Sequence, residues 1–203
     1  MLAEKRETWA IILGAGSSER MGTPKMMLRH QGKTLIQHVI EAAVDSDVDG
    51  VAVVINPDVD GLLAEATMAG VNKIFLNYQS NQGLSASVKS GLYVLPAEAE
   101  AAIFLLGDQP LISSREINLL LEESHADHSH SVYQSSYFGK RGHPVLFHRK
   151  MFNRLLEIKG DKGGRDLVKK YTDEVKIVEM GRNYPFDIDT MADFKKLLRR
   201  EVS

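Results

Sequence analysis

Two cations stand in a loop of small residues near the start of the chain. The sequence IILGAGSSERMGTPKMML (11–28) runs from an apolar stretch into glycines and serines, and Arg20 and Lys25 are its only cations. Small side chains let backbone N–H groups approach phosphate oxygens and form a concave nest for an anion. Arg20 and Lys25 would add charge to such a nest. The spacing therefore indicates a loop that binds the phosphates of a nucleotide.

Two other phosphate-loop patterns do not fit this stretch. The Walker A pattern G-x-x-x-x-G-K-[ST] ends correctly at 32–34, but its first glycine position holds Met27. The dinucleotide pattern G-x-G-x-x-G begins at 14–16, but its last position holds Glu19, where a glycine or alanine packs the helix on the strand. The loop alone leaves one alternative open, an ordinary glycine- and serine-rich connection between a strand and a helix.

Carboxylates occur at two further places that suit a metal ion. Asp108 directly follows the apolar run AAIFLLG (101–107), and ligands bind at the carboxyl ends of parallel strands. Asp187 and Asp189 are two residues apart in the extended segment FDIDT (186–190), so their side chains point the same way. Mg²⁺ prefers one or two carboxylates together with phosphate oxygens. A turn or helix cap is the alternative role of each carboxylate.

A segment of small residues opens a helical pattern in the middle of the chain. In NQGLSASVKSGL (81–92), Gly83 is followed by Ser85 and Ser87. Backbone N–H groups at a helix start and these two hydroxyls suit contact with the base or ribose of a nucleotide. The alternative is a capped helix whose small residues allow close packing.

Two glycine-rich turns later in the chain carry positive charge. They are GKRGHPVLF (139–147) and GDKGGRDLV (160–168). Cations held at fixed turns suit an anionic acceptor such as a phosphate monoester, whereas solvated turns are the alternative. The residues expected to contact this acceptor are Arg141, His143, Pro144, Lys162 and Arg165.

Composition excludes several classes of function. The 203 residues are 43% hydrophobic and 26% charged, with a formal net charge of −2 and dispersed cations, so no nucleic-acid surface is expected. The absence of cysteine excludes thiolate nucleophiles and cysteine-type zinc sites. The sequence contains no signal-peptide pattern and no stretch of membrane-spanning length, which predicts a cytoplasmic protein that does not contact a membrane.

Apolar runs alternate with helical patterns along most of the chain. Strands are expected at 8–13, 50–55, 73–77 and 101–107, and helices at 33–46, 58–70, 84–95 and 114–126. This alternation predicts an α/β fold with a mostly parallel central sheet and helices on both faces. A small antiparallel insertion is expected at 129–160. We expect a single domain over 1–203, with a nucleotide-binding part at 8–128 and an acceptor-binding and C-terminal part at 129–203.

As a set, these motifs resemble the MobA-like NTP transferases, and most closely the molybdenum cofactor cytidylyltransferase branch. The likeness runs from residue 9 to 197. Its motifs are L-G-A-G-S-S-E-R-M-G-T-P-K, Asp-x-Pro at Asp108, R-G-H-P, G-D-x-G-x-R and D-x-D-T-x-x-D. The resemblance implies a Rossmann-like nucleotidyltransferase fold.

The resemblance also implies roles for individual residues. The loop residues would wrap the triphosphate, and Arg20, Lys25 and Asp108 would be catalytic. Mg²⁺ would be held by Asp108 and Asp189, with Asp187 in support. The nucleotide-binding residues would be Leu13, Gly14, Ala15, Gly16, Ser17, Ser18, Gly83, Ser85 and Ser87.

The implied reaction is transfer of CMP from CTP to the terminal phosphate of molybdenum-molybdopterin, with release of pyrophosphate. The cytidylyl branch reads Leu-Ala-Ala-Gly and the guanylyl branch Leu-Ala-Gly-Gly; Ala15 is cytidylyl-like, whereas Gly14 departs from both. The alternatives are a guanylyltransferase that uses GTP and a cytidylyltransferase for another phosphorylated acceptor. A chaperone that delivers cofactor to a molybdenum hydroxylase such as xanthine dehydrogenase is the non-enzyme alternative.

Overall fold

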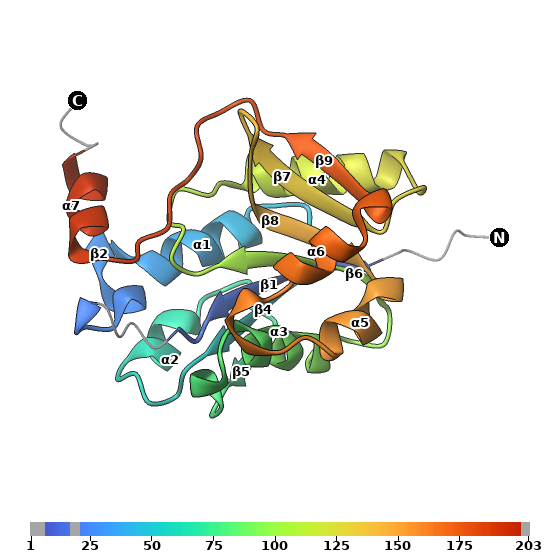
Figure 1. Cartoon of the computed structure of the whole chain (residues 1–203). Helices are drawn as coiled ribbons and strands as arrows, with labels where there is room; N and C mark the ends of the chain where they lie inside the picture. Colours follow the sequence, from blue (N-terminus) through green and yellow to red (C-terminus); the bar gives the residue numbers. More distant parts are fainter. Residues whose placement is uncertain (1–6, 17–20, 200–203) are drawn as a thin grey trace.

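A seven-stranded sheet runs through the centre of the molecule. The computed structural model describes residues 7–16 and 21–199 (Figure 1). The strand order is β5-β4-β1-β6-β8-β7-β9, and among the described strands of this sheet only β8 runs antiparallel to its neighbours. The strands are β1 (Glu7–Gly14), β4 (Gly50–Ile55), β5 (Lys73–Leu76), β6 (Ala99–Leu106), β7 (Val132–Tyr137), β8 (Lys140–His148) and β9 (Val175–Glu179).

Helices cover both faces of the sheet, as the alternating pattern predicts (Figure 1). In β1, Ala10 and Ile12 pack with α1 and α4, whereas Ile11 and Leu13 pack on the opposite face with α3, α5 and α6. Burial on both faces explains the unbroken apolar run of this strand. The helices are α1 (Leu35–Val44), α2 (Leu62–Ala66), α3 (Leu84–Tyr93), α4 (Ser114–Ala126), α5 (Phe152–Leu156), α6 (Arg165–Lys170) and α7 (Met191–Arg199).

Two helices begin later than the sequence pattern predicts. The helix expected at 33–46 begins only at Leu35, because 33–34 pairs with 29–30 as the two-stranded sheet β2 (Arg29–His30) and β3 (Lys33–Thr34). Thr34 then caps α1 in a reciprocal capping box. The helix expected at 58–70 is reduced to α2, which is preceded by Gly61 at φ +76°. Glycine adopts this left-handed conformation without a steric penalty.

The region after residue 128 extends the central sheet. The hairpin of β7 and β8 joins the sheet through the antiparallel pair β6–β8, and β9 then pairs parallel with β7. The predicted antiparallel insertion is therefore this hairpin, and it contributes to the same layer as the parallel strands. Within the part of the chain that the structure describes, no helix is both long enough and apolar enough to cross a membrane.

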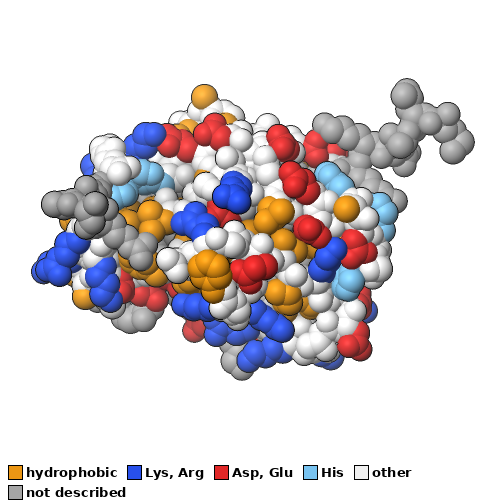
Figure 2. Space-filling view, turned by 90° about the horizontal axis from the view of Figure 1, so that it is seen from above, with side chains coloured by type: hydrophobic (Ala, Val, Ile, Leu, Met, Phe, Trp, Pro, Cys, Tyr) orange, Lys and Arg blue, Asp and Glu red, His pale blue; other side chains and the backbone are white. Residues whose placement is uncertain are grey.

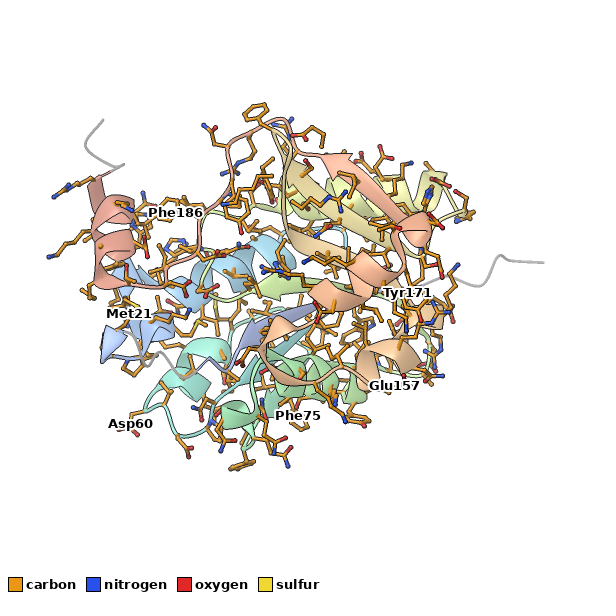
Figure 3. The ribbon with its side chains drawn as sticks, in the orientation of Figure 1. Met21, Asp60, Phe75, Glu157, Tyr171 and Phe186 are labelled. Atoms are coloured by element: carbon orange, nitrogen blue, oxygen red, sulfur yellow. The ribbon has the colours of Figure 1, made fainter. Side chains whose placement is uncertain are left out.

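A C-terminal strap, residues 180–190, returns from β9 to α7 across the carboxyl end of β6 (Figure 1). Arg182 Nη1 pairs with Glu116 Oε1 at 2.6 Å, and the backbone N–H of Ile188 donates to Asp108 O at 3.0 Å. The strap and α7 share a small apolar cluster to which Met21 and Phe186, labelled in Figure 3, both belong. The strap is thereby fixed against the end of β6.

Both signs of charge occur on the surface. The face in Figure 2 carries lysines, arginines, aspartates and glutamates together with hydrophobic side chains. This distribution accords with the formal net charge of −2.

Candidate functional site

Lys25 is the centre of a charged cluster at the carboxyl ends of β1 and β6. It begins the short 3-10 helix η2 (Lys25–Met27) and is 9% exposed. Its Nζ lies 2.5 Å from Asp108 Oδ2 and 3.0 Å from Asp189 Oδ1. The lysine thus joins the carboxylate after β6 to a carboxylate of the strap. The structure therefore brings three residues that the sequence analysis singled out into direct contact.

Burial and charge act in opposite directions on this cluster. Burial by itself lowers the pKa of Lys25, but the charges and hydrogen bonds of Asp108 and Asp189 outweigh it, so the pKa lies above 10.5. Burial raises the pKa of Asp108 above its ordinary value, against the opposing effect of Lys25, and the charges of Asp187 and Asp189 add to the rise. Lys25 is therefore a cation at neutral pH, and the carboxylates around it favour additional positive charge.

The cluster suits a divalent cation that also binds phosphate. Asp108 Oδ1 is buried and has no hydrogen-bond partner among the described residues, although its side chain lines a cavity. Within residues 7–16 and 21–199, no three His, Asp or Glu side chains are close enough to hold a metal by themselves. Mg²⁺ needs only one or two carboxylates when phosphate oxygens and water complete its shell, so the donor set fits.

Neither Asp108 nor Asp189 is needed as a helix cap. Ser113 caps α4 in a capping box with Glu116. At the start of α7, Thr190 Oγ1 accepts from the backbone N–H of Asp193 at 3.2 Å. The alternative reading of Asp108 and Asp189 as caps is therefore not supported, and both side chains face the cavity.

The charged cluster forms one end of a cavity of about 480 Å³. Its other walls are the loop after β1, the start of α3 and the turn at 160–164. The residues predicted from the sequence that line it are Leu13, Ala15, Gly16, Lys25, Gly83, Ser87, Asp108, Arg165, Asp187 and Asp189. The cavity therefore brings together small residues and charged residues from motifs that are distant in the sequence.

Some predicted nucleotide contacts lie elsewhere. Gly14 is buried between β4 and α1, where an added Cβ would come within 2.6 Å of Ile36 Cδ1, so this glycine serves packing and does not line the cavity. Ser85 is 5% exposed and does not line it either. Ser17, Ser18 and Arg20 lie outside the described residues, and their roles stay predictions.

A second cavity of about 440 Å³ adjoins the first. The two share Leu13, Leu84, Leu106, Arg165 and Asp187. Its floor is apolar, and its polar lining includes Gln134, Arg141, His143, Lys169 and Tyr184. Of the predicted acceptor residues, Arg141, His143 and Arg165 line it, whereas Pro144 is buried and does not. The side chain of Lys162 lies outside the part that the structure describes.

His143 differs from the expectation that it contributes positive charge. Burial, together with the nearby charge of Arg165, lowers its pKa to about 4. The imidazole is therefore neutral at pH 7. It offers hydrogen bonds to a ligand, and the positive charge of the second cavity comes from Arg141, Arg165 and Lys169.

Sequence reasoning missed Gln109 and Tyr184. Gln109 is fully buried directly after Asp108, and its Nε2 donates to Asp187 Oδ1 at 2.6 Å and to Tyr184 Oη at 3.2 Å. The position of Gln109 beside Asp108 was the only signal in the sequence. Tyr184 carried none, because its role depends on the path of the strap.

Asp161 was also missed. It lines the first cavity, and an added Cβ on Gly83 would come within 2.1 Å of Asp161 Oδ1. Gly83 also has φ +84°. Both the backbone conformation and the close approach of Asp161 therefore require glycine at 83.

The chain is similar to known proteins over most of its length. A profile described as MobA-like NTP transferase domain matches residues 10–175. The purine catabolism protein PucB of Bacillus subtilis (strain 168) is 30% identical over 168 residues, 78% of this chain and 79% of that protein. The bifunctional protein GlmU of Agrobacterium fabrum is 30% identical over 116 residues, 56% of this chain. The chain spans only 26% of that GlmU sequence.

Solved structures share the fold along almost the whole chain. The Mycobacterium tuberculosis Rv0371c homolog from Mycobacterium sp. strain JC1 superposes with a TM-score of 0.85 at 28% identity, covering 96% of both chains. Rv0371c of Mycobacterium tuberculosis H37Rv in complex with manganese superposes with a TM-score of 0.81 at 22% identity, covering 95% of this chain and 98% of that one. The predicted Rossmann-like nucleotidyltransferase fold is confirmed. Because the family profile matches most of its length, the chain belongs to the MobA-like NTP transferase family.

Proposed function

We propose that the protein transfers CMP from CTP to the terminal phosphate of molybdenum-bearing molybdopterin and releases pyrophosphate. The observation that carries this proposal is the junction of two cavities of different character at Asp187 and Arg165. One cavity holds the Lys25 cluster and suits a triphosphate. The other has an apolar floor with cations at its edge, which suits an acceptor that stacks a flat ring system on this floor and ends in a phosphate.

The chemistry needs positive charge and alignment more than a strong base. A phosphate monoester is already anionic near neutral pH, so its oxygen attacks the α-phosphorus directly. A bond forms between this oxygen and the α-phosphorus, and the bond from the α-phosphorus to the bridging oxygen breaks, so that pyrophosphate leaves. Holding both phosphates in line and neutralising their charge supplies the rate enhancement.

The chain's own residues divide this work. Lys25 stabilises the charge that grows on the departing pyrophosphate, and we assign the same role to Arg20. Asp108 and Asp189 would hold Mg²⁺ with Asp187 beside them, and this ion would neutralise charge on the reacting phosphates. The manganese complex of Rv0371c, a protein of the same fold, supports use of a divalent cation. Arg165 lies where it can contact either substrate, because it lines both cavities.

The lining of the second cavity supports molybdopterin over a sugar phosphate. Phe104, Val145, Phe147 and Val168 contribute to its floor and offer no hydrogen bonds to hydroxyl groups. Gln134 Oε1, buried and without a partner among the described residues, could accept from a ring N–H. Ala15 in the phosphate loop supports CTP. The name of PucB, a purine catabolism protein, accords with delivery of the product to a molybdenum hydroxylase such as xanthine dehydrogenase.

Pyrophosphate release by the purified protein tests the proposal. The assay contains Mg²⁺, molybdenum-loaded molybdopterin, and CTP, GTP or ATP in turn. Release with CTP that Asp108→Ala abolishes would support both the reaction and the metal site. Release with GTP alone would favour the guanylyltransferase alternative. Release only with another phosphorylated acceptor would overturn the acceptor assignment, and tight cofactor binding without release would favour a delivery chaperone.

A further inference from the structure

A buried amide lies directly behind the charged cluster. Gln109 is 0% exposed, and its Nε2 donates to Asp187 Oδ1 at 2.6 Å. Its other donor reaches Tyr184 Oη at 3.2 Å, and that hydroxyl in turn lies 3.4 Å from Asp187 Oδ2. Both oxygens of Asp187 are thus held from the protein side.

The orientation of the Gln109 amide costs free energy. Gln109 Oε1 is buried and has no hydrogen-bond partner among the described residues. An unsatisfied buried acceptor is unfavourable, and such groups in a folded protein call for a functional explanation. Rotating the amide would turn its oxygen toward the Asp187 carboxylate. The donors therefore point at Asp187 because the carboxylate requires them.

Tyr184 is itself immobilised. Its ring meets Tyr137 edge-on at a centroid distance of 5.5 Å, and Lys140 Nζ lies 3.5 Å from its centroid. An added Cβ on Gly142 would come within 2.5 Å of Tyr184 Cε2, so the hairpin backbone closes on the ring. Tyr184 also lines the second cavity, whereas Asp187 lines both. The contact between them therefore spans the boundary between the cavities.

We propose that Gln109 is a positioning residue: with the Tyr184 hydroxyl it fixes the Asp187 carboxylate at the boundary between the two cavities, and this orientation sets the affinity for a divalent cation. The inference rests on the proposed function, because it assumes that the carboxylates of the strap serve a metal–phosphate site. Partners that orient metal-binding carboxylates typically change metal affinity by about 10- to 100-fold when removed.

The test measures Mn²⁺ affinity by electron paramagnetic resonance, with the α,β-methylene analogue of CTP present so that no turnover occurs. Gln109→Met keeps the length of the side chain but removes its donors, and we expect an affinity about tenfold weaker or more. Tyr184→Phe keeps the ring and removes one contact, so a smaller loss is expected. Gln37→Met is the matched control, since Gln37 accepts from the Thr34 backbone N–H in the cap of α1 and lines neither cavity. It should lower the unfolding temperature without changing Mn²⁺ affinity.

The outcomes separate this inference from the proposed function. If Asp108→Asn and Asp187→Asn weaken Mn²⁺ binding but Gln109→Met and Tyr184→Phe do not, Gln109 has no positioning role and the metal site stands. If Asp108→Asn, Asp187→Asn and Asp189→Asn all leave the affinity unchanged, the metal site itself is refuted. Should Gln109→Met fail to fold, Tyr184→Phe decides, and an unchanged affinity in that variant contradicts the inference.

Discussion

The two cavities of this protein are built by different means. The first is lined by the loop after β1, a buried lysine and four carboxylates, which come from the end of β6, from the turn at 160–164 and from the strap. The second is formed largely by β8, α6, α3 and β6 around an apolar floor, with arginines at the edge. Charged side chains distinguish the first cavity, and the apolar floor distinguishes the second. We infer that the first performs the reaction common to the family, whereas the second selects the acceptor.

We expect the largest loss of activity when a charged residue of the first cavity is replaced. Asp108→Ala removes a proposed metal ligand and the main partner of Lys25, which lies 2.5 Å away. We expect kcat to fall on the order of 10³-fold, because charge stabilisation at the reacting phosphates carries the rate. Single-turnover kinetics with CTP would measure this. A variant that retains kcat within a few-fold would remove Asp108 from the mechanism.

Lys25→Met should have the next largest effect. We expect about a 10²-fold loss of kcat, since removal of one charge-stabilising group typically costs this much. The KM of the acceptor should stay nearly constant, because Lys25 does not line the second cavity. Steady-state kinetics with each substrate varied separately would check both expectations. A rise in acceptor KM with kcat unchanged would contradict the division between the cavities.

Arg141→Ala should act mainly on the KM of the acceptor, in contrast to Lys25→Met. This residue lines only the second cavity, so we expect the KM of the acceptor to rise about tenfold, as for loss of one hydrogen bond to a charged group. The KM of CTP should not change. Arg115→Ala, which removes an exposed arginine on α4 away from both cavities, is the matched control. Equal effects of both substitutions would mean that Arg141 makes no specific contact.

The smallest predicted effect concerns His143 and pH. Its pKa is about 4 in the folded protein against 6.5 ordinarily, so the unfolded chain binds the extra proton more readily between these values. This contribution to stability is present above pH 6.5 and is lost as the pH falls toward 4. Because the side chain is partly exposed, we expect a loss of only about 1 kcal/mol between pH 7.5 and 5.

Urea unfolding at the two pH values would measure that loss. His143→Gln should make the stability less dependent on pH in this window, because the amide does not titrate. An identical pH dependence in the wild type and the variant would show that another group is responsible.

The sequence predicted the residues of the first cavity better than those of the second. Asp108 and the loop after β1 follow neighbouring parallel strands, so their proximity is a consequence of sheet topology. The spacing of Asp187 and Asp189 in an extended segment was likewise enough to place both at one cavity. Gln109 and Tyr184 could not be predicted, because their contact depends on how a loop more than seventy residues later crosses β6.

Local sequence patterns did not reveal the surroundings of two residues, because tertiary packing determines them. The glycine at 14 reads as part of a phosphate loop, but it packs against Ile36 and does not line the first cavity. The histidine at 143 reads as a cation, but burial keeps it neutral. In both cases the residue type was correctly noticed, and its role was set by neighbours that the sequence does not reveal.

The most direct test of the account follows the labelled phosphate. The purified protein is incubated with Mg²⁺, molybdenum-loaded molybdopterin and CTP that carries ³²P at the α-position or, separately, at the γ-position. We predict that the α-label moves to a molybdopterin dinucleotide and that the γ-label appears in pyrophosphate. Retention of the α-label in CTP or in free CMP, with no labelled dinucleotide, would contradict the claim that the two cavities join a nucleotide to this acceptor.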